Sequence, residues 1–244
     1  MISNEISNVQ PVMLWVKPAT SWRRRALNHA RPAAAAKDMS TSSNVKHYDT
    51  KDIDSRLAYQ LLVGTVVPRP IAWISTLSAA GVSNLAPYSF FTVASTYPPV
   101  LSVTQVNPRV GADKDTLSNL RQTKECQVNL VTHDLVGIMN ASCANYPHDV
   151  SEFEAVGIDS VPGTLVRAPG VAAALVRMEC TLRDVVAIGN SSVMYLDVVR
   201  FAVRDAVARD GRPVDDARFV GVGKLGGDGY TKTTDRFDLP RPQL

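Results

Sequence analysis

The sequence is poor in the residues that mark metal centres and disulfide-stapled domains. Its 244 residues include three cysteines, Cys126, Cys143 and Cys180, which are odd in number and form no Cys-x-x-Cys pair. This spacing argues against a zinc site and against a disulfide framework. The four histidines share no spacing typical of metal ligands. We therefore expect no metal, and a reducing cytoplasm as the protein's setting.

Long apolar runs and a strong charge of one sign are missing as well. No uninterrupted apolar stretch approaches about 18 residues, so no transmembrane helix is expected. The net charge of +3 comes from residues 1–38, which hold six Lys or Arg and two acids, so the remainder is close to neutral. A nearly neutral folded part does not favour nucleic acid as a partner. The sequence therefore predicts neither a membrane nor a nucleic-acid partner.

Familiar catalytic patterns are also missing. No Ser/His/Asp or Cys/His constellation stands out, and no G-x-G-x-x-G follows an apolar strand. We therefore assign no catalytic side chain and no dinucleotide-binding domain. A hydrophobic content of 45% with 20% charged residues is enough for a sizeable core. Residues 46–244 are interpreted as one domain.

Residues 1–45 give no core pattern and have several interpretations. An Arg-rich segment that is poor in acids is typical of a mitochondrial-type targeting sequence. Arg24 and Arg25 also suggest a twin-arginine signal, but no apolar region follows them. The interpretation that we favour is a disordered extension, or an upstream start with Met39 as the natural first residue.

From residue 46 onward the pattern is mainly β. Segments rich in Val, Ile, Leu and Tyr predict strands at 70–77, 82–86, 89–95, 99–106, 126–131, 175–189 and 192–206. Helices are predicted at about 113–124, 132–142 and 151–157, the last with a Ser151/Glu154 capping box. Tyr59 to Val67 is apolar and leads into the first strand, and Asp210-Gly211 marks a turn. This order predicts a β-barrel with a few inserted α-helices.

The segment 64–91 has the features of a ligand cradle. Prolines on both sides of Arg69 keep the chain extended as it enters a buried strand, and Gly81 suits a hairpin turn with positive φ. Residues 84–91 then mix small residues, hydroxyls and aromatics. We interpret Phe91 as a core residue rather than as a ligand contact. Arg69 has two interpretations: a tie from its guanidinium to a carbonyl or acid at the strand entry, which we favour, or a contact with a phosphate or a nucleotide.

Lys114-Asp115-Thr116 begins a predicted helix. Asp113 and Asp115 are interpreted as helix caps, the usual role of an acid at this place. Lys114 is different, because a cation near a helix N-terminus opposes the helix dipole. A phosphate reverses this balance, since Lys114, the free amides and the Thr116 hydroxyl all donate to it. A solvated lysine is the alternative.

Four blocks in order carry a family resemblance: residues 64–91, 114–120, 128–142, and 224–230 closing on 237–242. The sequence resembles the flavin reductase-like, FMN-binding split-barrel family over roughly residues 46 to 242. The resemblance implies FMN as cofactor, NADH or NADPH as a transient substrate, a possible partner oxygenase and a homodimer. It supports these cofactor-binding residues: Asn84, Ala86, Pro87, Tyr88, Ser89, Phe90, Lys114, Asp115 and Thr116. Asn140 matches a block without a physical role.

The resemblance leaves the activity open. The hypothesis that we favour is an NAD(P)H-dependent FMN reductase, in which hydride passes from the nicotinamide to the flavin. The alternative is a non-enzymatic FMN electron carrier or flavin-binding protein. A relative that binds haem is disfavoured, because no His/Met ligand pair is evident. Tyr230, after a glycine-rich loop, has three interpretations: a cover for the flavin, a dimer contact or a plain surface residue.

Overall fold

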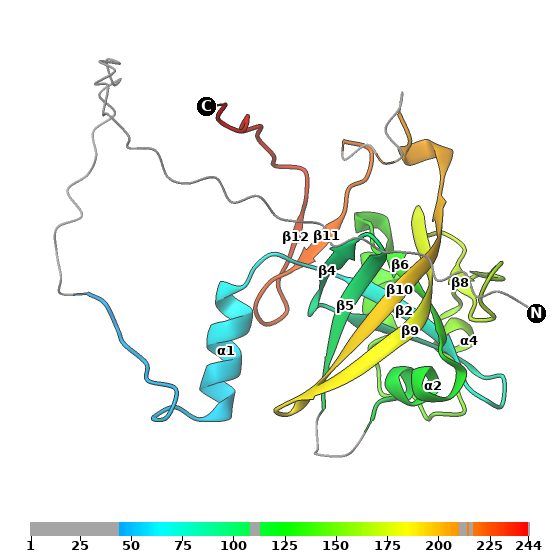
Figure 1. Cartoon of the computed structure of the whole chain (residues 1–244), viewed down its shortest axis with the longest axis horizontal. Helices are drawn as coiled ribbons and strands as arrows, with labels where there is room; N and C mark the ends of the chain where they lie inside the picture. The colour runs from blue at the N-terminus through cyan, green and yellow to red at the C-terminus, as the bar shows by residue number, and fades with distance from the viewer. Residues whose placement is uncertain (1–43, 108–112, 210–213, 215–216, 244) are drawn as a thin grey trace, which may run out of the picture. The chain divides into compact units, whose positions relative to one another are not determined.

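A seven-stranded antiparallel sheet forms the frame of the protein (Figure 1). The computed structural model describes residues 44–107, 113–209, 214 and 217–243, so the predicted extension and the predicted 210–211 turn lie almost wholly outside it. The strand order is β3-β2-β6-β9-β10-β5-β4. Their bounds are β2 Ala72–Leu77, β3 Ser83–Tyr88, β4 Phe91–Thr96, β5 Pro99–Val106, β6 Glu125–Leu130, β9 Val176–Ile188 and β10 Ser191–Val203.

The sheet curls into a barrel-like shape. The edge strand β3 contacts β5, which lies next to the opposite edge strand β4. The seven strands correspond to the seven predicted segments within a few residues. The mainly β architecture with inserted helices is therefore confirmed. Gly81 has φ of 88° in the turn between β2 and β3, as its position predicts.

Five short strands form two further sheets that the sequence did not predict. β1 (Arg69–Pro70), β11 (Val222–Lys224) and β12 (Tyr230–Lys232) make a three-stranded sheet. β7 (Ser160–Val161) pairs with β8 (Gly170–Val171). Segments of two or three residues are too short to show a period of two in the sequence.

Three short helices pack on the sheet. The helices of the described chain are α1 Ser55–Thr65, α2 Asp115–Thr123, α3 Val136–Ala141 and α4 Glu152–Val156, with 3-10 turns η1 His133–Leu135 and η2 Asp205–Val207. α2 contacts β2 and β3, and α3 and α4 contact β3. The prediction missed α1, although the Asp54 side chain caps it by accepting from the Leu57 amide at 2.7 Å. No helix among the described residues is long and apolar enough to cross a bilayer.

The predicted capping box at α4 is wrong. Ser151 occupies the N-cap position, but its side chain makes no capping hydrogen bond. The Ser151 hydroxyl instead lies 2.7 Å from the Ser83 hydroxyl, because α4 packs on β3. Gly157 ends the helix with φ of 72°, as predicted.

Two apolar clusters lie on opposite faces of β2. Ala72 and Ile74 point into the barrel, where Leu117 and Leu120 of α2 are fully buried beside them. Trp73 points to the other face, in a cluster to which α3 and α4 contribute. Full burial of a leucine side chain stabilises a fold by about 1.5–3 kcal/mol. The two leucines therefore fix α2 firmly at the end of the barrel.

A buried carboxylate holds the loop that precedes β8. Glu179 on β9 accepts hydrogen bonds from the amides of Thr164, Leu165 and Val166. Arg200 on β10 lies 3.7 Å from the same carboxylate. Burial alone would raise the pKa of Glu179, but these hydrogen bonds and Arg200 outweigh it and hold the pKa below its ordinary value.

Candidate functional site

The N-terminus of α2 has no side-chain cap within the described part of the chain. Lys114 occupies the N-cap position with extended backbone, and its carbonyl accepts the first helical hydrogen bond from Ser118 at 3.0 Å. Asp113 pairs with Arg121 at 2.8 Å, and Asp115 is the first helical residue. The prediction that these two acids cap the helix is therefore wrong. Amides of the first turn remain available to a ligand.

A buried network of amides and hydroxyls fixes this helix end. Asn84 on β3 donates to the Thr116 hydroxyl at 3.0 Å and to the Thr76 hydroxyl at 3.4 Å. Asn119, one turn along α2, donates to the same Thr76 hydroxyl at 3.0 Å. Thr116 is 1% exposed, and its hydroxyl also interacts with the Tyr88 phenol. The first turn of α2 is thereby held rigidly against β2 and β3.

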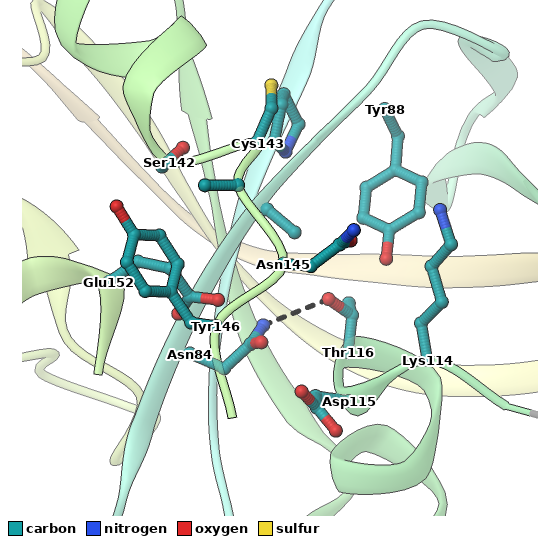
Figure 2. Close-up of a pocket in the computed structure, with 13 residues that line it drawn as sticks. Asn84, Tyr88, Lys114, Asp115, Thr116, Ser142, Cys143, Asn145, Tyr146 and Glu152 are labelled. Carbon is teal, nitrogen blue, oxygen red and sulfur yellow. Dashed lines mark hydrogen bonds between the residues drawn. The ribbon is translucent and has the colours of Figure 1, made fainter. Parts of the chain in front are cut away.

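A cavity of about 340 Å³ opens at this helix end. Its walls come from β3, the start of α2, the segment that follows α3, and the first residue of α4 (Figure 2). The lining residues are Asn84, Ala86, Pro87, Tyr88, Lys114, Asp115, Thr116, Ser142, Cys143, Ala144, Asn145, Tyr146 and Glu152. Lys114 is the only lysine or arginine among these described residues.

Seven of the nine predicted cofactor-binding residues line this cavity, and two do not. The exceptions are Ser89 and Phe90, where the chain turns from β3 into β4. The Ser89 hydroxyl accepts from Arg69 Nε at 3.5 Å, and the Phe90 ring centroid lies 5.8 Å from the Arg69 guanidinium. The side chains of both residues are therefore directed to Arg69 rather than to the cavity. Phe91 packs against the barrel core, as expected.

Arg69 is a structural residue. Its side chain is buried and donates to the carbonyls of Val63 at 2.7 Å, Val66 at 2.6 Å and Leu225 at 3.0 Å. The interpretation that its guanidinium ties the strand entry to carbonyls is confirmed. It also joins the end of α1 to the loop after β11.

Six lining residues were not predicted, and Glu152 is the most informative of them. Its Oε2 accepts from the Leu85 amide at 2.8 Å, at the edge of the sheet. Burial raises the pKa of Glu152, hydrogen bonds from backbone amides lower it, and the nearby Asp115 charge raises it further. The sequence offered little reason to assign Glu152 to the site, because an acid in the first turn of a helix is usually explained by its favourable interaction with the helix dipole. Here the carboxylate instead accepts a hydrogen bond from a backbone amide of the edge strand β3.

The wall opposite Glu152 carries a neutral hydroxyl. Tyr88 is 6% exposed, and its hydroxyl lies 3.4 Å from the Gln105 amide oxygen, to which it donates. Burial raises the pKa of Tyr88 well above its ordinary value, although a hydrogen bond with Thr116 opposes the shift. The phenol therefore stays protonated across the physiological range.

The donor set suits the phosphate of the ligand that the resemblance implies. Lys114, the uncapped amides of α2 and the Thr116 hydroxyl all lie at one end of the cavity. Ala86 and Pro87 offer small apolar surfaces along β3, which a flat ring requires. Among the described residues no group of three or more His, Cys, Asp or Glu is placed to hold a metal ion.

Comparison with known proteins places this geometry in a family. Residues 63–215 match the family model described as flavin reductase like domain. A protein of Deinococcus radiodurans is 37% identical over 202 residues, which cover 80% of this chain and 89% of the relative.

Two solved structures agree with this match. Nitrilotriacetate monooxygenase component B from Bacillus cereus is 29% identical, with a TM-score of 0.77 over 81% of this chain and 100% of its own. The 2-nitrobenzoate 2-nitroreductase of Pseudomonas fluorescens is 30% identical, with a TM-score of 0.73 over 81% of this chain and 96% of its own. The chain therefore belongs to the flavin reductase-like family, a flavin-binding family, and has its split-barrel fold.

Proposed function

We propose that the protein is an FMN-dependent NAD(P)H:flavin oxidoreductase. The observation that carries the proposal is the start of α2, where Lys114 and uncapped amides face a cavity bordered by Thr116. A helix N-terminus and a nearby ammonium group together favour a compact dianion. Asn84 supports the site indirectly, because it orients the Thr116 hydroxyl.

The same geometry favours FMN over FAD. The phosphate of FMN is a terminal monoester with three free oxygens, which several converging donors can bind at once. In FAD the corresponding phosphorus is linked to the ribityl oxygen and, through an anhydride bond, to a second phosphate, so it keeps only two free oxygens and less charge. One lysine, one hydroxyl and one helix end match the monoester.

The chain's residues would bind and orient the flavin rather than exchange protons with it. A bound flavin supplies the redox chemistry, accepting hydride from the nicotinamide. Ala86 and Pro87 would lie along the ring, and Glu152 keeps the Leu85 edge amide satisfied. Transfer between stacked rings depends on alignment more than on an acid or base, so no catalytic side chain is required.

The similar solved structures and the exposed apolar residues suggest the partners of the protein. The likeness to a monooxygenase component B supports a role as the reductase of a two-component oxygenase. Tyr59 and Leu62 on α1 and Val93 on the edge strand β4 are more than half exposed, which supports a homodimer. The three cysteines are free thiols, which supports a cytoplasmic setting.

Anaerobic mixing tests the activity. The FMN-loaded protein is mixed with NADH or NADPH in a stopped-flow spectrometer, and flavin absorbance is followed. Rapid bleaching with either donor supports the reductase. Absence of bleaching with both donors, in protein that retains FMN, would leave an electron carrier or binding protein.

A further inference from the structure

A second polar cluster lies where the hairpin of β11 and β12 meets α3. The ammonium group of Lys224 lies 4.3 Å from the ring centroid of Tyr230. The Tyr230 hydroxyl lies 3.5 Å from the Asn140 side-chain oxygen, to which it donates. We call these three residues the hairpin rim. Cofactor binding as proposed above uses none of them.

The hairpin rim and the cavity meet at Cys143. Cys143 lines the cavity, and its side chain lies within electrostatic reach of both Lys114 and Lys224. Cys143 is also close enough to Tyr230 to affect its pKa, which is raised mainly by burial and further by Cys143. A ligand that fills the cavity would therefore have the hairpin rim at its border.

Lys224 is held in place with one donor to spare. Its ammonium group donates to the carbonyls of Gly227 and Gly229, whereas an ammonium has three protons. Lys224 and Tyr230 are only partly buried, so both remain open to a ligand. Asp228 in the same loop is exposed, and its charge raises the pKa of Tyr230. This negative charge partly opposes the binding of an anion. The result is a preoriented cation next to an aromatic ring.

We propose that the hairpin rim is the docking site of the pyridine dinucleotide, with Lys224 binding its pyrophosphate. This inference rests on the proposed function, because it takes Lys114 as the partner of the flavin phosphate. A second ligand that stacks on the flavin and carries its own phosphates then needs a second cation. Lys224 is a second cation whose charge reaches Cys143 in the cavity wall. Tyr230 offers an aromatic surface beside it.

Binding of NAD⁺ and NADP⁺ tests the assignment without turnover. Dissociation constants are measured from the change in flavin absorbance of the FMN-loaded protein, at several NaCl concentrations. Lys224→Met should weaken binding of the better nucleotide about tenfold and flatten its salt dependence, because one charge-assisted contact is lost. Lys224→Arg should retain most of the affinity and the salt dependence. FMN affinity should be unchanged in both variants.

Lys232→Met is the matched control, since Lys232 is an exposed lysine on the same hairpin. It should leave nucleotide affinity unchanged. The inference is overturned if neither nucleotide binds the wild type, if Lys224→Met binds as tightly as the wild type, or if FMN affinity falls in parallel. Nucleotide binding that depends on Lys224 without bleaching by NADH or NADPH would support the docking site and refute the proposed activity.

Discussion

Replacing Lys114 by alanine should change FMN affinity and the stability of the ligand-free protein in opposite directions. Lys114 is the N-cap residue of α2, and no described side chain caps that helix end. In the ligand-free protein its ammonium group opposes the helix dipole, so its removal should raise the free energy of unfolding by a few tenths of a kcal/mol. With FMN present the same group would donate to the phosphate.

The magnitude follows from the loss of one charge-assisted hydrogen bond. Such a bond contributes about 1.5–3 kcal/mol, which corresponds to a roughly ten- to hundredfold increase in the dissociation constant. The helix amides and the Thr116 hydroxyl remain, so FMN binding should be weakened rather than abolished. Riboflavin lacks the phosphate, and its affinity should be the same for the variant and the wild type.

Two titrations and one unfolding experiment measure these effects. Quenching of flavin fluorescence gives the dissociation constants of FMN and riboflavin, and urea unfolding gives the stability of the apoprotein. Lys51→Ala, at an exposed lysine in a turn near the start of the described chain, is the matched control. Equal losses of FMN and riboflavin affinity, or no loss of either, would refute the phosphate assignment.

Two further predictions concern buried ionisable groups. Glu179→Gln should lower the free energy of unfolding at pH 7 by about 1.5–3 kcal/mol, since the carboxylate serves three amides and Arg200. Because the folded state depresses the Glu179 pKa, this contribution should disappear as the pH falls below its ordinary value of 4.5; a pH-independent difference in urea unfolding would contradict it. Tyr88→Phe should remove a loss of stability that the wild type shows above pH 10, since burial raises the Tyr88 pKa and the unfolded phenol ionises first. Identical unfolding curves of wild type and Tyr88→Phe against pH, from 8 to 11, would count against this.

The strands were predictable because their side chains alternate between two buried faces. Over residues 71–74, where β2 begins, Ile71 and Trp73 join one cluster while Ala72 and Ile74 join the other. Such a run of apolar residues is short enough to indicate a strand. The helix α1 was not predicted, because its apolar residues were interpreted as an approach to the first strand. Its Asp54 cap is visible in the sequence but is shared with many turns.

The candidate site was predictable where it depends on local chemistry. Lys114 and Thr116 combine a helix start with phosphate donors, and both line the cavity. Ser89 and Phe90 were assigned to the site by their position in the family block 64–91, but their side chains contact the buried Arg69 instead of the cavity. Glu152 was not predictable, because its partner Leu85 is 67 residues away and the contact depends on the packing of α4.

A crystal structure with FMN bound tests the central claim most directly. We expect the phosphate within hydrogen-bond distance of Lys114 Nζ, the Thr116 hydroxyl and at least one amide of the first turn of α2. A second cavity of about 330 Å³, lined by His133, Arg218 and Lys232, offers an alternative set of basic groups. A phosphate bound there, or bound in the first cavity without contact to α2, would contradict the account.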